Sequence, residues 1–189
     1  MYFIVSVILI VFMLIVPGRA DARKWRVKPS DLAADYSQII DQRAGNEVVV
    51  IYWVAPETMD ASIQNVEAFR SMLRDYIIVG AAHGTASQTG RLNFRVPEGL
   101  VVQSGDGKAR QPLAKETWPP LVTAFSTVIQ NFMSQSMGQL GEGFNWFVFE
   151  GKGIESCGKG RFWVAYAGER YNYETPIPGC SQSGGAPQQ

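Results

Sequence analysis

One short segment, residues 47–55, constrains the fold more than any other part of this chain. Its sequence, EVVVIYWVA, is apolar at almost every position and rich in β-branched residues. A strand with one solvent-exposed face alternates apolar and polar residues, whereas a strand without alternation is covered on both faces. We therefore expect residues 47–55 to form a central strand that is buried on both sides.

Further short strands are expected at turn-separated intervals along the rest of the chain. They cover residues 75–82, 91–96, 100–103, 108–113, 144–149, 162–167 and 170–175. The strand at 91–96 alternates apolar and polar residues, which indicates one exposed face. Residues 83–90 are mostly small, which predicts a turn region. The Ser-Gly-Asp-Gly sequence that begins at Ser104 is typical of a tight hairpin.

Three segments have the periodicity of amphipathic helices. The first begins at Ser30, the expected N-cap, carries Leu32, Tyr36, Ile39 and Ile40 on one face and ends at Gly45. The second begins at Pro56 and continues to residue 74. The third and strongest covers residues 120–138, with an apolar face that spans its whole length.

This succession predicts a mainly β fold with helices, of the α+β class. The expected form is an antiparallel β-sandwich with helical connections packed across its ends. The order of strand, Pro-Glu-Gly break, strand, Gly-Asp-Gly turn and strand in residues 91–113 resembles immunoglobulin-like domains, which makes an immunoglobulin-like sandwich one version of this prediction. The alternative is a two-layer α+β fold in which the helices at 57–74 and 120–138 cover one antiparallel sheet.

Residues 1–22 are expected to be a signal peptide. The run from Met1 to Val16 is apolar and uncharged, and Ala20 and Ala22 match the small-x-small rule for cleavage before Arg23. The run is also shorter than the ~20 residues of a membrane-spanning helix. Basic residues follow the run instead of preceding it, as in a membrane anchor, so an N-terminal anchor is the alternative. A buried core helix is a third interpretation.

Residues 23–180 are expected to form a single globular β-rich domain, followed by a disordered polar tail at 181–189. The chain has 2 cysteines, Cys157 and Cys180, and such a pair in an exported protein predicts a disulfide. The expected location is the periplasm or the extracellular space. The alternative is attachment to the membrane through residues 1–16.

The charge balance excludes one class of partner. The chain has 17 Lys and Arg against 17 Asp and Glu, for a formal net charge of +0 at pH 7. Nucleic-acid binding needs a basic surface, so we expect no nucleic-acid partner, and membrane contact only through an uncleaved N-terminal segment. The sequence contains neither a P-loop nor a dinucleotide-binding glycine pattern, and its 1 histidine cannot form the usual zinc site. We expect no cofactor and no metal.

His83 is the one weak candidate for a catalytic residue. It ends a predicted strand and precedes a loop of small residues, which is a common place for a general base. No G-x-S-x-G motif accompanies it, and the Ser-x-x-Lys sequence at 156–159 lacks the other motifs of penicillin-recognising enzymes. We expect a protein that is not an enzyme. The alternative is a small exported hydrolase that uses His83 with a nearby carboxylate.

Aromatic residues in the last three predicted strands are the most informative excess. They occupy both faces of these strands, so one face lines the core and the other is available to pack under a helix or to bind sugar rings or peptide. Trp163, Tyr171 and Tyr173 have the most polar neighbours and are the expected binding residues. The leading hypothesis is an exported non-enzymatic binding or structural module of the cell envelope or secretome, which binds an unknown protein or glycan through an aromatic sheet face.

Overall fold

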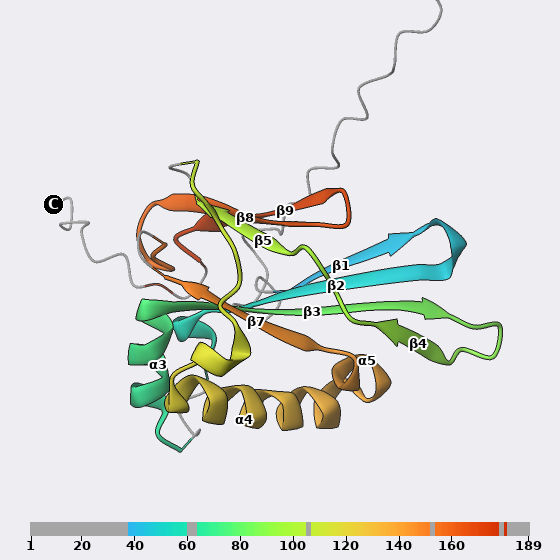
Figure 1. The fold of residues 1–189 in the computed structure, drawn as a ribbon, viewed down its shortest axis with the longest axis horizontal. Helices are drawn as coiled ribbons and strands as arrows, with labels where there is room; N and C mark the ends of the chain where they lie inside the picture. Colours follow the sequence, from blue (N-terminus) through green and yellow to red (C-terminus); the bar gives the residue numbers. More distant parts are fainter. Residues whose placement is uncertain (1–37, 60–63, 105–106, 152–153, 178–179, 181–189) are drawn as a thin grey trace, which may run out of the picture.

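The computed structural model describes residues 38–59, 64–104, 107–151, 154–177 and 180. Figure 1 shows a small sheet, a larger sheet and a group of helices arranged as successive layers. The expected signal segment at 1–22 and the expected tail at 181–189 lie outside the described residues. So does the first part of the helix that the sequence predicts after Ser30.

The larger sheet is antiparallel and has five strands among the described residues. Strands β1 (Gln38–Arg43), β2 (Glu47–Val54), β3 (Tyr76–Ala86) and β4 (Leu92–Arg95) follow one another in order, and β7 (Asn145–Glu150) also pairs with β3. Strand β3 is long enough for two partners on the same edge. Its first half pairs with β7 and its second half, from His83, pairs with β4.

The smaller sheet contains four described strands in the order β6-β5-β8-β9. These are β6 (Ala109–Arg110), β5 (Val101–Ser104), β8 (Gly160–Tyr166) and β9 (Glu169–Thr175). All strand pairs in the described part of the chain are antiparallel. The predicted β-rich α+β class is therefore confirmed, whereas an immunoglobulin-like topology is not confirmed by this strand order.

The helices lie along the outer face of the larger sheet. They are α3 (Val66–Asp75), α4 (Pro120–Met137) and the short α5 (Gln139–Glu142). The described chain also has three 3-10 turns, which are η1 (Ala44–Asn46) in the hairpin between β1 and β2, η2 (Pro56–Thr58) and η3 (Lys115–Thr117). Figure 1 shows α3 and α4 on the side of the larger sheet that faces away from β5, β8 and β9. The expectation that helices pack across the ends of a sandwich is therefore wrong. Helices cover one face of a sheet, as in the alternative prediction.

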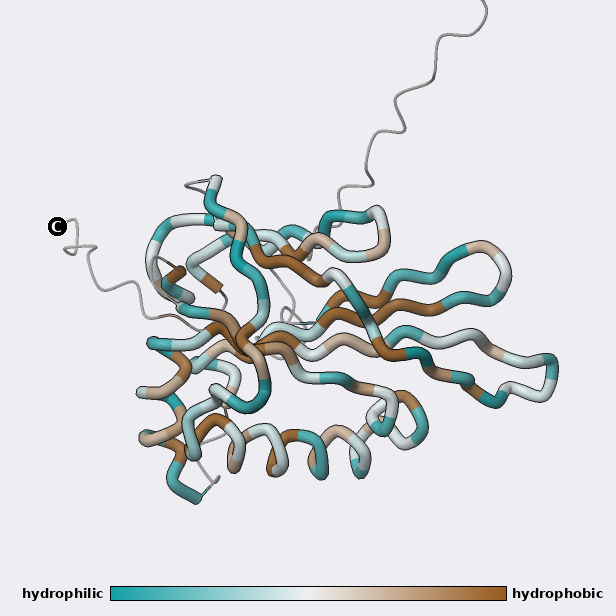
Figure 2. The backbone as a smooth tube through the Cα atoms, in the orientation of Figure 1, coloured by the Kyte–Doolittle hydropathy of each residue, from teal (hydrophilic) through white to brown (hydrophobic). Residues whose placement is uncertain are grey.

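Two hydrophobic clusters lie on opposite faces of the larger sheet and explain the sequence of β2. Val49, Ile51 and Trp53 point toward the smaller sheet and pack in one cluster with its strands. Val50 and Val54 point the other way and pack in a second cluster with α3 and α4. Figure 2 shows that the most hydrophobic residues are concentrated in the strands at the centre of the molecule. The prediction that this strand is buried on both faces is confirmed.

The predicted first helix is wrong in its described part, because Gln38–Arg43 forms strand β1. This segment pairs antiparallel with β2, so that Ile39 faces Ile51 and is buried while Ile40 is 46% exposed. Pairing along β2 satisfies the backbone of the segment and separates two residues that a helix would place on one face.

The second predicted helix is shorter than expected, and the predicted turn after residue 82 begins later. Helix α3 starts only at Val66, after Asn65 in a left-handed conformation with φ of 61°. Residues Pro56–Thr58 form the separate turn η2. Strand β3 continues through His83 as far as Ala86, because β2 and β4 supply partners on both sides of this stretch.

Cys157 and Cys180 form the predicted disulfide, with their Cα atoms 5.4 Å apart. Cys157 precedes β8 and Cys180 follows β9, so the bond joins the two ends of this hairpin. Closing a loop of this size contributes on the order of 3 kcal/mol to the free energy of unfolding.

Helix α4 begins at a proline and ends before Gly138, whose φ is 54°. Neither it nor any other helix in the described residues is long and apolar enough to cross a membrane.

Gly80 in β3 offers a test of packing between the larger sheet and the helices. A Cβ atom at this position would lie 2.6 Å from Trp146 Cζ3 and 2.8 Å from Phe144 Cδ1. We expect Gly80→Ala to lower the free energy of unfolding by about 1–3 kcal/mol, because two buried rings would have to shift. Urea denaturation would measure the change.

Gly160→Ala is the matched control, because its added Cβ would lie 3.4 Å from Thr175 Oγ1, an ordinary contact. Its effect is expected to stay within about 0.5 kcal/mol. Equal stability of Gly80→Ala and the wild type would contradict the tight packing described here.

Candidate functional site

The outer face of the smaller sheet is organised around Trp163. Its neighbours along β8, Phe162 and Val164, are fully buried in the cluster between the sheets, and Trp163 points to the opposite side and is half-buried. Trp163 pairs directly with Gln103 of β5 on one side and with Asn172 of β9 on the other. Residues that face each other across antiparallel strands share a face of the sheet. The indole therefore lies between two amide side chains.

Specific contacts hold the indole of Trp163 in place. Its Nε1 donates a hydrogen bond to Gln103 Oε1 at 3.0 Å, and Gln103 Nε2 donates to the carbonyl of Gly107 at 2.7 Å. The guanidinium of Arg170 lies over one face of the ring, 4.6 Å from the ring centre, which is a favourable cation–π distance. The ring is thus oriented before any ligand arrives.

Charged residues complete this surface. Arg161 and Glu174 pair across β8 and β9 beside Trp163, and Ala165 pairs with Arg170 on its other side. Helices α3 and α4 contact the larger sheet, and no described helix or strand covers the outer face of the smaller one. We call the surface formed by Gln103, Arg161, Trp163, Arg170, Asn172 and Glu174 the Trp163 face.

The structure does not bring the three predicted binding residues onto one face. Tyr171 and Tyr173 are both 0% exposed and belong to the cluster between the sheets. In the register of β8 and β9, Tyr171 pairs with Val164 and Tyr173 pairs with Phe162, so both tyrosines share the inner face. Because side chains alternate along a strand, Trp163 alone of the three points outward. The predicted joint aromatic face is wrong for this reason.

His83 lies in a buried polar network at the end where β2, β3 and β4 meet the smaller sheet. It is 1% exposed. Its Nε2 lies 2.7 Å from Glu47 Oε1, and its Nδ1 contacts the hydroxyl of Tyr166. A carboxylate can only accept, so Nε2 donates, and the Nδ1 of a neutral ring then accepts from Tyr166. Arg95 donates from Nη2 to the same Glu47 oxygen at 2.6 Å.

A second group of residues continues this network between the two sheets. Arg43 donates from Nε to Asp41 Oδ2 at 2.8 Å and from Nη2 to the hydroxyl of Tyr171 at 2.7 Å. The Tyr171 hydroxyl in turn donates to Asp41 Oδ2 at 3.0 Å. Burial is the main cause that raises the pKa of Tyr171 well above its usual range. The phenol therefore stays protonated and serves as a hydrogen-bond donor across the interface between the sheets.

The network around His83 is better suited to structure than to catalysis. Both ring nitrogens are engaged, and the described residues that bond to His83 include no serine, threonine or cysteine that could act as a nucleophile. Sequence reasoning selected His83 but missed Asp41, Arg43 and Glu47. Nothing in the local sequence shows that the pairing of β1, β2 and β3 would place them together.

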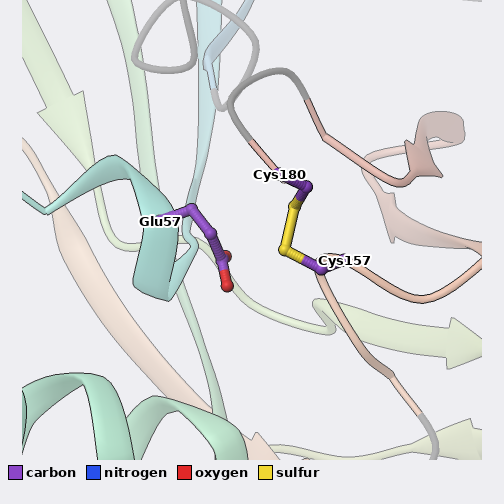
Figure 3. Close-up of side chains that lie close together, drawn as sticks. All are labelled: Glu57, Cys157 and Cys180. Atoms are coloured by element: carbon purple, nitrogen blue, oxygen red, sulfur yellow. A yellow bond between two sulfur atoms is a disulfide. The ribbon is translucent and has the colours of Figure 1, made fainter. Parts of the chain in front are cut away.

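A third cluster lies at the disulfide. Glu57 of η2 lies close to Cys157 and Cys180, and Figure 3 shows its side chain beside the disulfide. One carboxylate oxygen and the two Sγ atoms all lie within 4.8 Å of one another. Oxygen Oε2 of Glu57 is buried and accepts no hydrogen bond from the described residues. A hollow of about 370 Å³ adjoins this cluster, with Glu57, Arg74, Glu155 and Cys157 in its lining.

Comparisons with known proteins add no further constraint. No protein-family model matches this chain, and neither does any curated protein or solved structure. The geometry of the three clusters is therefore the basis on which a function can be assigned.

The pairing of Glu47 with His83 makes a prediction about acid stability. The hydrogen bond from His83 is the main cause that holds the pKa of Glu47 below its ordinary value of 4.5. A carboxyl group with a lowered pKa in the folded state contributes stability above its unfolded-state pKa. That contribution is lost as the pH falls through the lower folded-state value. We expect the free energy of unfolding to decrease below about pH 4.5, and to decrease less in Glu47→Gln.

Urea denaturation at several pH values from about 3 to 7 would measure this difference. Glu98→Gln is the matched control, because Glu98 is an exposed carboxyl in the loop after β4. The control should follow the wild-type profile. Parallel profiles for Glu47→Gln and the wild type would contradict the assigned interaction.

Proposed function

We propose that this protein is an exported, non-enzymatic binding module that holds a glycan on the Trp163 face. The observation that carries the proposal is a single oriented indole surrounded by amide, guanidinium and carboxylate groups, on a sheet face that no described helix or strand covers. The sequence hypothesis of an aromatic sheet face is thereby narrowed from three residues to one.

The chemistry of the Trp163 face favours a sugar over a protein partner. A sugar ring presents C–H groups on its faces, which pack on an aromatic ring, and hydroxyl groups at its edge, which bond to polar side chains. Gln103 Nε2 and Asn172 Nδ2 each donate one hydrogen bond to a backbone carbonyl, which leaves each amide a second N–H for a sugar hydroxyl. Arg161 and Glu174 lie next to them. The centre of a protein interface usually combines several apolar anchors and excludes charged residues. The Trp163 face has a single apolar anchor, the indole of Trp163, and charged side chains lie around it.

Export is supported by two features. The disulfide between Cys157 and Cys180 is typical of proteins in oxidising compartments. The apolar residues at 1–16, followed by a small-x-small site, support a secretory signal as the route. An immunoglobulin-like sandwich remains a hypothesis for the fold, supported by two sheets that enclose one cluster of buried residues.

Retention on polysaccharides tests the proposed function. Purified protein would be passed over a panel of immobilised bacterial and plant polysaccharides, and the dissociation constant measured for those that retain it. Trp163→Ala is expected to weaken binding about tenfold or more, equivalent to ~1.4 kcal/mol, because it removes the ring on which the sugar packs.

Phe132→Ala is the matched control. Phe132 is an aromatic residue that is 62% exposed, and it lies on helix α4 at the opposite side of the molecule from Trp163. The control should bind as the wild type does. Equal polysaccharide binding by Trp163→Ala and the wild type would contradict the proposal. The proposal would also be contradicted if the wild-type protein bound protein ligands but none of the polysaccharides.

A small exported hydrolase is the second candidate function. It is favoured by the 2.7 Å contact between His83 Nε2 and Glu47 Oε1, which supplies the nearby carboxylate that such an enzyme needs. If the wild type hydrolyses any ester or glycoside, His83→Gln should lower kcat by 10²–10⁴-fold, roughly the contribution of a general base. Undiminished turnover in the variant would remove this candidate.

A further inference from the structure

We propose that reduction of the Cys157–Cys180 disulfide creates a binding site for a zinc-like divalent metal ion, with Glu57 as the third protein ligand. The proposal is independent of glycan binding. It concerns a different part of the molecule from the Trp163 face, and it rests on the arrangement drawn in Figure 3.

The spacing of the three side chains matches what such an ion requires. Zinc bonds to thiolate sulfur at about 2.3 Å and to carboxylate oxygen at about 2.0–2.2 Å, so ligands of one ion lie roughly 3–4 Å from each other. The candidate ligand atoms of Glu57, Cys157 and Cys180 already lie within 4.8 Å of one another. With the Cα atoms of the cysteines 5.4 Å apart, rotation about the Cα–Cβ bonds can separate the two sulfurs without a backbone movement.

Glu57 itself points to a missing partner. Its Oε2 is buried and receives no hydrogen bond from the described residues, although a buried acceptor without a donor destabilises a fold by about 1–3 kcal/mol. The sulfurs of a disulfide carry no hydrogen and cannot donate to this oxygen. A metal ion held by two thiolates beside Glu57 would satisfy the carboxylate.

The surroundings permit both the reduction and the entry of a metal ion. Cys157 is exposed and Glu57 and Cys180 are half-buried, so a small reductant can reach the bond. The hollow of about 370 Å³ beside them leaves room for the ion and a water molecule as fourth ligand. Arg74 lines the same hollow and can balance the surplus negative charge of two thiolates and one carboxylate around a divalent ion.

The chemical steps balance with a dithiol as reductant. The dithiol transfers two electrons and two protons to the disulfide, which becomes two thiols while the reductant becomes a disulfide. Each thiol then releases its proton to solvent as its sulfur binds the metal. Reoxidation by a disulfide of higher reduction potential reverses both steps and releases the ion. The site therefore couples metal binding to the redox state of the compartment.

Cobalt(II) provides a direct readout of this site, because thiolate coordination produces charge-transfer bands in the near ultraviolet. The full chain would be reduced with a phosphine, freed of it under argon and titrated with Co²⁺, followed by displacement with Zn²⁺. We expect one equivalent of Co²⁺ to bind to the reduced protein with these bands, and none to the oxidised protein. Zn²⁺ should also raise the Tm of the reduced protein alone.

Glu57→Gln tests the third ligand, and Glu155→Gln is its matched control because Glu155 is an exposed carboxyl that lines the same hollow. Loss of a partner group at a metal site lowers the metal affinity about 10–100-fold. The dissociation constant for Zn²⁺ should therefore rise at least about tenfold in Glu57→Gln. Glu155→Gln should bind as the wild type does.

Three results would overturn the proposal. The first is the absence of charge-transfer bands in the reduced wild type. The second is equal Zn²⁺ affinity in Glu57→Gln and the wild type. The third is loss of the fold on reduction, seen in the near-ultraviolet circular dichroism, without recovery when Zn²⁺ is added.

Discussion

Burial of the larger sheet on both of its faces is the constraint on which the rest of the structure depends. Strand β2 directs alternate apolar residues to the smaller sheet and to the helices, and β3 does the same beside it. Removing so much apolar surface from water requires a layer on each side. The smaller sheet supplies one layer, and α3 and α4 supply the other (Figure 1).

This layering decides where function can reside. The smaller sheet is one of the two outer layers, so only its inner face contributes to the core and its outer face carries Trp163 among polar groups. The inner face uses Tyr171 and Tyr173 as large core residues. Tyr171 also donates a hydrogen bond from its hydroxyl to Asp41, and this polar contact joins the two sheets.

The polar network around His83 occurs where the two sheets meet beyond the apolar part of their interface. Taking charged groups such as Asp41 and Arg43 out of water is unfavourable unless they are paired and hydrogen-bonded. Here each charged group has a partner on its own strand or on another strand. The contacts between the sheets join β1 to β9 through Tyr171, and β3 to β8 through His83 and Tyr166. Such a network favours one relative position of the sheets.

The sequence by itself determined the strand predicted at 47–55, the helix predicted at 120–138, the antiparallel β-rich class and the pairing of Cys157 with Cys180. Each depends on local periodicity or on the only possible pairing. Tertiary structure alone decided that Gln38–Arg43 is a strand, because the backbone partners that stabilise it lie along β2. It also decided which aromatic residues face outward, since the register of β8 and β9 is set by distant packing. Glu57 reaches the disulfide, and Glu47 reaches His83, through the same long-range contacts, which no local pattern encodes.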